Sequence, residues 1–433
     1  MTIRNTEPRA RETVGGHIGA PWQGMRNAVF AMIAVMASAS RGGDAVGKEI
    51  EAWQPGMLDI HQISTGRGNS ALHIYPDGTT VLVDAGELGT KTLRHTPDRP
   101  NGTRPAGEWI ARYIRHALRH DPQPRLDYAL ATHFHDDHMG NASTNLPVSK
   151  SGAYTLSGIT TVGEEFRIGK MIDRGWPDYG YPGPVKVGFI DNYRAFLKWQ
   201  TENSAMKVER FAPGRADQIV LCREPGKYPN FSFRNVGANG EIWTGVGTAT
   251  RRHFPDLETV PRPDWPHENM CSTSFRLSYG KFDYFNGGDI PGVPAEGTPE
   301  WHDVETPVAK AVGPVEAAIL NHHGYVDSQN AFFIGALRPR VWIISVWDAG
   351  HPTERVWQRL RSKRIYQEPR DVFATDVHEA TRIVLGGIDR LASDHGHIVL
   401  RVSPGGDEYR VVIVDDTSED HHVTKVFGPY GAR

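Results

Sequence analysis

The chain has 433 residues, of which 39% are hydrophobic and 23% charged, and its formal net charge at pH 7 is −3. These values are ordinary for a soluble globular protein of one to three domains. The near-neutral balance excludes a global basic field, so strong nucleic-acid binding is not indicated, although a local basic groove stays open. The two cysteines, Cys222 and Cys271, exclude a zinc ribbon and a disulfide framework. They could pair in an exported protein or remain two free thiols.

Residues 1–50 form a predicted N-terminal extension with a segment typical of an export signal. Met25-Arg26 precedes an uncharged run, and Ala37-Ser38-Ala39 resembles a small-residue cleavage site. The polar residues before Met25 are either an extended start of the signal or precede the true start. The segment at about 25–39 predicts a periplasmic or secreted protein; the alternative is a cytoplasmic protein in which it is an ordinary helix or arm. No other segment resembles a transmembrane helix.

The folded part is expected to begin near Met57 with strands followed by a helix. Residues 58–63 alternate apolar and polar side chains, as a half-buried strand does, and 71–75 and 79–83 are typical of two more strands. Between residues 106 and 120 the apolar side chains recur at the spacing of an amphipathic helix. A fourth strand is predicted at 126–131.

The remainder of the chain alternates between strand and helix patterns and proline-rich loops. The predicted elements are a loop at 170–187, a helix at 191–200, strands within 231–247, an irregular connection at 255–267, a hairpin at 272–285, a loop at 291–306, strands at 314–320 and 341–347, a short helix at 353–361 and a hairpin at 397–414. This alternation predicts one layered α/β domain with mixed sheets over residues 51–433, rather than two separable domains.

The strongest chemical signal directly follows the strand predicted at 126–131. It is the stretch Thr132-His133-Phe134-His135-Asp136-Asp137-His138-Met139-Gly140-Asn141. A lone histidine is usually a core or surface residue, but three histidines and an aspartate in this order are hard to obtain by chance. Imidazole nitrogens and a carboxylate suit zinc, with iron or manganese as near relatives. The stretch therefore predicts a metal site.

Three further elements place a metal-binding side chain at the end of a predicted strand. Asp84 ends an early strand, Asp289 follows the hairpin on a Gly-Gly turn, and the pair His322-His323 follows the strand at 314–320. Each element is weak by itself, because an aspartate after a strand is usually a turn residue and paired histidines are often at the surface. Together they repeat the pattern of the histidine stretch.

In these motifs the chain resembles the metallo-β-lactamase superfamily, and in particular the branch of the ComEC/Rec2 competence proteins. The resemblance runs from about Leu58 to Val414. Its marks are Gly-Asn-Ser-Ala-Leu at 68–72, Val-Asp-Ala-Gly at 83–86, the histidine stretch, Ser-Phe-Arg-Leu-Ser-Tyr-Gly at 274–280, Asn-Gly-Gly-Asp at 286–289, Asn-His-His-Gly at 321–324 and Ser-Val-Trp-Asp-Ala-Gly-His-Pro at 345–352. The resemblance implies a metallo-β-lactamase-like αβ/βα sandwich with two mixed β-sheets flanked by helices.

The resemblance also implies a ligand set for two divalent metal ions, zinc before manganese or iron. His133 and His135 would bind the first ion. Asp137 and His138 would bind the second, and Asp289 would bridge the two.

Other ligands are less defined by the motifs. One histidine of the pair would complete the second ion; His323 is preferred, with His322 as its partner. His267 is the first choice for a third histidine on the first ion, since its distance in sequence from Asp289 resembles that in the superfamily, and His253 is the other choice. Asp84 would orient the histidine stretch.

The predicted function is that of a dinuclear metal-dependent hydrolase in which the metal ions activate a water molecule. Asp137 would orient that water or accept its proton. His351 could donate a proton or contact the substrate, or simply precede a helix, and Tyr325 is a weaker choice.

The substrate predicted first is a phosphoester or phosphodiester. The alternatives are a carboxylic ester, lactone or amide, including a β-lactam, and a non-catalytic binding protein on the same fold. His135 occupies a position where ComEC-type domains often carry aspartate, which favours a more general metallohydrolase. No long nucleic acid is indicated as a partner, and the oligomeric state stays open.

Overall fold

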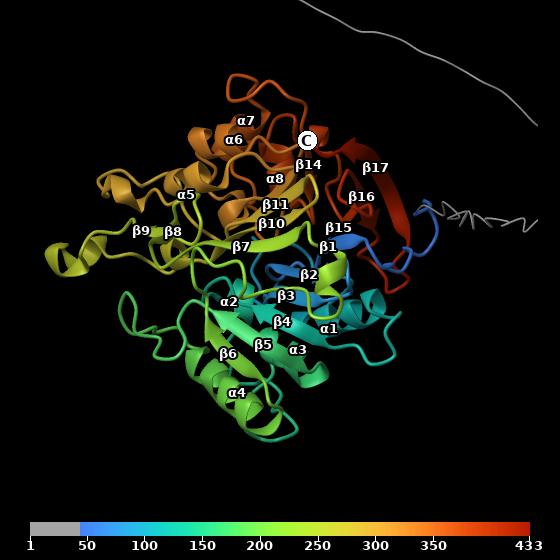
Figure 1. Ribbon diagram of the computed structural model, residues 1–433, viewed down its shortest axis with the longest axis horizontal. Helices are drawn as coiled ribbons and strands as arrows, with labels where there is room; N and C mark the ends of the chain where they lie inside the picture. Colours follow the sequence, from blue (N-terminus) through green and yellow to red (C-terminus); the bar gives the residue numbers. More distant parts are fainter. Residues whose placement is uncertain (1–43) are drawn as a thin grey trace, which may run out of the picture. The chain divides into compact units, whose positions relative to one another are not determined.

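Two mixed β-sheets form the centre of the structure (Figure 1). The computed structural model describes residues 44–433, so the predicted export segment at about 25–39 lies outside the described residues. The first sheet has the strand order β17-β16-β15-β1-β2-β3-β4-β5-β6, and the second has the order β14-β13-β12-β11-β10-β7-β8-β9. The described residues belong to one compact unit.

The first sheet is antiparallel from β17 to β3 and parallel from β3 to β6. Its strands are β1 (Leu58–Gln62), β2 (Ser70–Ile74), β3 (Thr80–Ala85), β4 (Leu126–Leu130), β5 (Ile168–Asp173), β6 (Lys207–Arg210), β15 (His397–Val402), β16 (Glu408–Val414) and β17 (Val423–Gly431).

The second sheet is antiparallel from β11 to β9 and parallel from β11 to β14. Its strands are β7 (Phe231–Ala238), β8 (Glu241–Trp243), β9 (Thr250–Arg252), β10 (Ser274–Tyr279), β11 (Phe282–Asn286), β12 (Ala317–Ile319), β13 (Val341–Ile344) and β14 (Asp371–Ala374).

Helices cover the outer face of each sheet (Figure 1). The helices are α1 (Ala106–Ala117), α2 (Asp136–Met139), α3 (Ile159–Glu165), α4 (Ile190–Asn203), α5 (Glu305–Val312), α6 (Ala331–Leu337), α7 (Glu354–Arg361) and α8 (Glu379–Val384). One core joins the first sheet to α1, α3 and α4, another joins the second sheet to α5, α6 and α7, and a third lies between the sheets.

Side-chain alternation along the strands builds these three layers of core. In β4, Leu130 faces the other sheet, whereas its neighbour Ala129 faces the helices, because successive strand residues point to opposite faces. In β13, Ile343 and Trp342 divide between the two faces of the second sheet in the same way. Burial of each such large side chain contributes about 1.5–3 kcal/mol, so both faces of both sheets hold the sandwich together. The architecture is the predicted αβ/βα sandwich.

The sequence located most elements but missed some of them. The predicted strands near residues 58, 71, 80 and 126 and the helix from residue 106 are present. The loop predicted at 170–187 is wrong at its start, because residues up to Asp173 belong to β5, which pairs in parallel with β4. The exposed glycine and half-buried lysine in this strand hide its pattern. The elements that were not predicted are the helices α2, α3, α5, α6 and α8 and the strands β6, β9, β14 and β17.

The folded part begins earlier than the predicted start near Met57. Asp44 accepts two hydrogen bonds from Nη1 of Arg401, at 2.8 and 2.9 Å, and Glu49 forms an isolated β-bridge with His422. Polar residues that pair with distant partners carry no hydrophobic pattern, so the sequence does not reveal this boundary. Across the described residues, every helix is too short or too polar to cross a membrane. Both Cys222 and Cys271 are free.

Candidate metal centre

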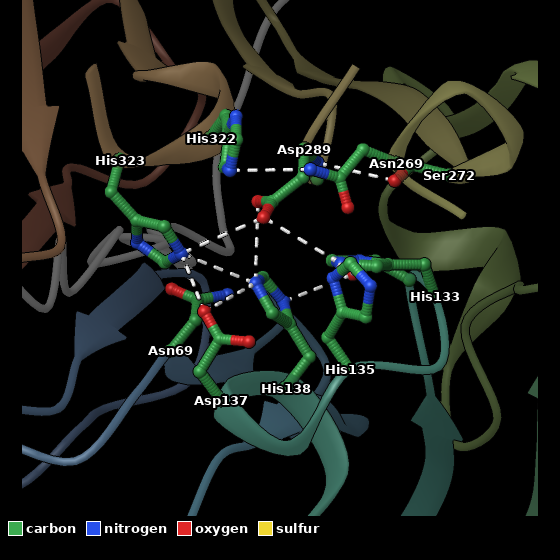
Figure 2. Close-up of polar contacts among 12 residues, drawn as sticks. Asn69, His133, His135, Asp137, His138, Asn269, Ser272, Asp289, His322 and His323 are labelled. Atoms are coloured by element: carbon green, nitrogen blue, oxygen red, sulfur yellow. Dashed lines mark hydrogen bonds and ion pairs between the residues drawn. The ribbon is translucent and has the colours of Figure 1, made fainter. Parts of the chain in front are cut away.

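The predicted ligands meet because strands from both sheets end at one edge. The strand β4 runs parallel to β3 and leads directly into His133, while Asp84 lies at the end of β3. The strand β12 runs parallel to β11; Asp289 follows β11, and His323 follows β12. Because the carboxyl ends of parallel strands share an edge, four strand ends from two sheets present polar side chains to one place. Figure 2 shows the side chains of His133, Asp289 and His323 converging.

The first group of converging side chains contains Asp137, His138, Asp289 and His323, all of them buried. His323 Nε2 lies 3.0 Å from Asp137 Oδ2 and 3.3 Å from His138 Nε2. His138 Nε2 lies 3.5 Å from Asp137 Oδ2 and 3.2 Å from Asp289 Oδ1. An ion held tetrahedrally by bonds of 2.0–2.1 Å has ligand atoms roughly 3.3–3.4 Å apart. The four side chains therefore fit one zinc-sized ion.

The orientation of two imidazoles in this group also calls for a cation. His138 Nδ1 contacts the carboxylate of Asp84 at 2.8 Å, and His323 Nδ1 contacts the carbonyl of Ser345 at 2.8 Å. Each Nδ1 therefore carries the proton, and each neutral ring directs the lone pair of Nε2 inward. Two lone pairs that face each other at 3.3 Å repel unless a proton or a metal ion lies between them.

The second group contains His133, His135 and Asp289. His133 Nε2 lies 3.1 Å from His135 Nδ1 and 3.6 Å from Asp289 Oδ2. Asp289 belongs to both groups, as expected of a bridging carboxylate. The buried His/Asp cluster thus has the composition and spacing of a two-metal site, and its histidine-rich donors suit zinc or iron.

His267, the predicted third histidine, does not join the second group. It is exposed, and its ring lies 6.4 Å from the ring of His302. His253, the other choice, has its Nε2 2.9 Å from the carbonyl oxygen of Trp301. Neither histidine belongs to a group of converging donor atoms in this structure, and a ligand role for either of them stays a prediction. A metal ion in this group would keep open positions for water or substrate.

Asp84 orients the histidine stretch, as the resemblance implied. Its carboxylate accepts hydrogen bonds from the Thr132 backbone N–H at 2.7 Å, the Thr132 hydroxyl at 2.9 Å and the Asn69 amide at 2.9 Å. The short helix α2 also packs closely on the glycine after β3, where a Cβ on Gly86 would lie 1.9 Å from the carbonyl oxygen of Asp137. Only glycine permits this approach.

A partly buried ion pair that the sequence did not predict holds the other side of the stretch. Glu268 accepts a hydrogen bond from the backbone N–H of Phe134 at 2.8 Å, between the two histidines of the second group. Arg174 donates to the same carboxylate at 2.7 Å and stacks on the Phe134 ring at 4.6 Å. Glu268, which is next to His267 in the sequence, therefore contacts the histidine stretch itself. Nothing in their sequence spacing links Arg174 with Glu268.

His322 lies beside the two groups and outside both of them (Figure 2). Its Nδ1 contacts Asp327 at 2.6 Å, and its Nε2 lies 3.2 Å from the Asn269 amide nitrogen. His322 and His323 have φ values of 44° and 55°, a region that costs non-glycine residues about 1–3 kcal/mol each. The preceding Asn321 secures this turn through a 2.8 Å hydrogen bond to the buried carboxylate of Glu305.

Of the residues proposed for catalysis, His351 lies against His323, a ligand of the first group, and Tyr325 contacts His351. His351 is buried and stacks on the His323 ring at 4.7 Å with an interplanar angle of 19°. Tyr325 contacts the His351 ring edge-on at 6.2 Å. These contacts hold the His323 ring in place, and the proton-donor role of His351 stays a prediction.

The electrostatics follow from burying carboxylates and imidazoles together. Burial by itself would raise the pKa of Asp289, but His138, His323 and His133 outweigh it and hold that pKa well below its usual range. Burial would lower the pKa of His138, but the carboxylates of Asp289, Asp137 and Asp84 outweigh it and raise that pKa. Both directions show that the ionised carboxylates favour a positive charge at this place, which a metal ion on Nε2 of a neutral His138 would supply instead of a second proton.

Comparisons with known proteins place the chain beside several solved structures of low sequence identity. No protein-family model matches the chain, and no curated protein matches its sequence. One structural match is a putative metal-dependent hydrolase from Parabacteroides distasonis, with 13% identity and a TM-score of 0.34 over 75% of this chain and 96% of the other.

Two further matches are a diiron β-hydroxylase and a tRNase Z. CmlA, the diiron β-hydroxylase from Streptomyces venezuelae, has 12% identity and a TM-score of 0.37 over 82% of this chain and 55% of its own. The short form of human tRNase Z has 13% identity and a TM-score of 0.31 over 80% of this chain and 99% of its own.

Proposed function

We propose that this protein is a dinuclear metal-dependent hydrolase that acts on a phosphoester or phosphodiester. The observation that carries the proposal is the position of Asp289, whose carboxylate belongs to both groups of converging ligands. A carboxylate in this position can hold two divalent ions at the short separation of a two-metal hydrolytic centre. The sequence marks shared with the ComEC-type branch support the phosphoester substrate over a carboxylic ester, lactone or amide.

The residues of the centre supply binding, orientation and a proton acceptor. His133, His135 and Asp289 would hold one divalent ion, and the group Asp137, His138, Asp289 and His323 would hold the other. When bound, two such ions lower the pKa of water toward ~7 and neutralise charge that develops on the substrate. Asp137, whose Oδ2 faces His323 Nε2 at 3.0 Å, is placed to accept the proton of the attacking water.

A substrate screen tests this proposal. Metal-loaded protein is offered bis-p-nitrophenyl phosphate, p-nitrophenyl phosphate, a lactone and a chromogenic β-lactam. Turnover of a phosphate ester that is lost on chelation and restored by zinc, manganese or iron is the expected result. Turnover of the lactone or β-lactam alone would assign the centre to carbonyl substrates, and no turnover by a fully metallated protein would favour a binding protein.

We also propose export to the periplasm or the medium, on the basis of the segment at about residues 25–39. The described residues do not bear on it. N-terminal sequencing of protein from its native host should find a start after Ala39, whereas an intact Met1 in the cytoplasm would rule export out.

A further inference from the structure

The indole ring of Trp347 lies at the rim of the metal centre, in the segment that follows β13. It is partly exposed, and three imidazoles surround it. The ring contacts His323 at 5.7 Å, His351 at 4.7 Å and His95 at 5.6 Å, each time edge to face, with interplanar angles of 77°, 89° and 74°. Contacts on three sides fix the direction in which its N–H points.

That N–H points at a ligand atom of the centre. Trp347 Nε1 lies 3.2 Å from His323 Nε2. An indole N–H is a donor only, and the proton of His323 is on Nδ1, which faces the Ser345 carbonyl. The lone pair of His323 Nε2 is therefore the acceptor of the indole hydrogen bond.

The same lone pair is the one that a metal ion would use. His323 Nε2 lies 3.0 Å from Asp137 Oδ2 and 3.3 Å from His138 Nε2, within the group that fits a zinc-sized ion. One lone pair cannot serve a metal ion and an N–H donor at once. With the ion bound, Trp347 keeps its place between the imidazoles but needs another acceptor beside the ion.

We propose that Trp347 is a substrate-binding residue, whose indole N–H donates a hydrogen bond to an anionic oxygen of a phosphoester held at the group Asp137, His138, Asp289 and His323. This inference rests on the proposed function, because it needs a metal ion at that group. A charged oxygen suits this position, since hydrogen bonds to ionised acceptors are stronger than neutral ones.

Trp347→Phe tests the proposal, because phenylalanine keeps an aromatic ring and removes only the donor. Trp243→Phe is the matched control: the Trp243 Nε1–H donates to the Gly247 carbonyl at 3.0 Å in β8, away from the ligand groups. Inorganic phosphate is the probe, and calorimetry measures its binding to metal-loaded protein. Trp347→Phe should weaken phosphate binding about tenfold, the effect of one hydrogen bond, while Trp243→Phe leaves it unchanged.

Metal binding distinguishes a donor from a structural support. Since the indole N–H competes for His323 Nε2, Trp347→Phe should bind zinc at least as tightly as the wild type does. Loss of zinc affinity in Trp347→Phe would instead mean that the ring only supports His323, and would overturn the proposal. In the ¹⁵N-labelled wild type, the indole resonance that is missing from Trp347→Phe should move on zinc addition and again on phosphate addition.

The outcomes separate this inference from the proposed function. If the wild type binds phosphate and Trp347→Phe binds it equally well, the inference fails while the hydrolase proposal stands. If the wild type hydrolyses no phosphate ester, the hydrolase proposal fails, and the indole resonance still decides whether Trp347 meets phosphate. A wild type that binds two metal ions but no phosphate would overturn the inference as well.

Discussion

Two clusters of buried and partly buried histidines lie in the described part of the chain, and only one has the arrangement of a metal site. The first, here called the metal cluster, combines four histidines with two aspartates: His133, His135, His138, His323, Asp137 and Asp289. The other, here called the stacked cluster, gathers His61, His116, His397 and His421 around Tyr113 between α1 and the first sheet.

Ring contacts, rather than converging lone pairs, define the stacked cluster. Tyr113 packs on His397 at 4.3 Å, and His116 packs on His421 at 3.9 Å. The Tyr113 hydroxyl lies 3.0 Å from His61 Nδ1. The inward nitrogens do not approach a common point, so no ion would find a full ligand set there.

Carboxylates make the second difference between the clusters. Asp59 lies 3.7 Å from His61 Nε2, but Arg401 holds its carboxylate at 2.8 Å. In the metal cluster, Asp84 instead accepts a hydrogen bond from Nδ1–H of His138, which leaves Nε2 of that ring free to bind a metal ion. Histidines in a protein interior thus become ligands when a second hydrogen bond fixes the proton on the far nitrogen and carboxylates balance the charge.

The largest effect expected is that of Asp289→Asn. It removes the carboxylate shared by both ligand groups, so activity should fall by about 10³-fold or more and metal content should drop. Asp173→Asn is the matched control, because Asp173 is equally buried at the end of β5 but accepts hydrogen bonds from Tyr179 and Tyr193. The measurements are steady-state kinetics and metal analysis. An Asp289→Asn protein with full metal and activity would contradict the bridging role.

Asp84→Asn should have the next largest effect. The amide cannot accept from Thr132 and His138 as the carboxylate does, so the His138 ring loses its fixed proton position. Zinc affinity should fall about 10–100-fold, as for other residues that orient ligands. Competition with a chelator dye measures this affinity. Unchanged affinity would show that the backbone of the stretch is rigid without Asp84.

Removing one histidine from each cluster in the same experiment tests the comparison directly. His421→Ala, in the stacked cluster, should lower the free energy of unfolding by about 2 kcal/mol and leave metal content unchanged, because it removes packing only. His323→Ala should instead lower the metal content, because it removes a ligand of the group Asp137, His138, Asp289 and His323. Urea unfolding and metal analysis of both variants decide the matter. Metal loss in His421→Ala would make the stacked cluster part of the centre.

The stacked cluster should also make the protein sensitive to acid. Burial lowers the pKa of His421 to about 4, and burial together with His421 lowers the pKa of His116 to about 3. The unfolded chain, with histidine pKa values near ~6.5, takes up protons that the folded chain does not. Stability is therefore complete above about pH 6.5 and is lost as the pH falls toward 4.

His421→Phe tests this dependence because it keeps a ring but cannot titrate. Between pH 7.5 and pH 5, it should lose on the order of 1 kcal/mol less stability than the wild type does. Urea midpoints at the two pH values, at saturating metal for both proteins, give the comparison. Equal losses would show that His421 does not carry the acid sensitivity.

The sequence revealed those parts of the fold and site that are encoded locally. The histidine stretch is one short segment, and the strands before Asp84, Asp289 and His323 each end in a recognisable turn. Contacts between distant segments were not visible in this way. Glu268 meets Phe134 across more than a hundred residues, and only folding brings them together.

The same limit applies to individual residues. His267 had a suitable spacing, but no local rule fixes the path of the proline-rich connection that carries it. Trp347 follows a strongly apolar run of the sequence, so the importance of its N–H became visible only from its distance to His323. A segment such as β5 was missed because its pairing with β4, rather than its own composition, makes it a strand.

The most direct test of the account is the metal content of the protein purified without chelators, by inductively coupled plasma mass spectrometry. The two ligand groups predict close to two transition-metal ions per chain in the wild type, after reconstitution if needed. The His323→Ala variant should retain about one ion, since it leaves the group of His133, His135 and Asp289 intact. A folded wild-type protein that binds no transition metal under these conditions would contradict the central claim.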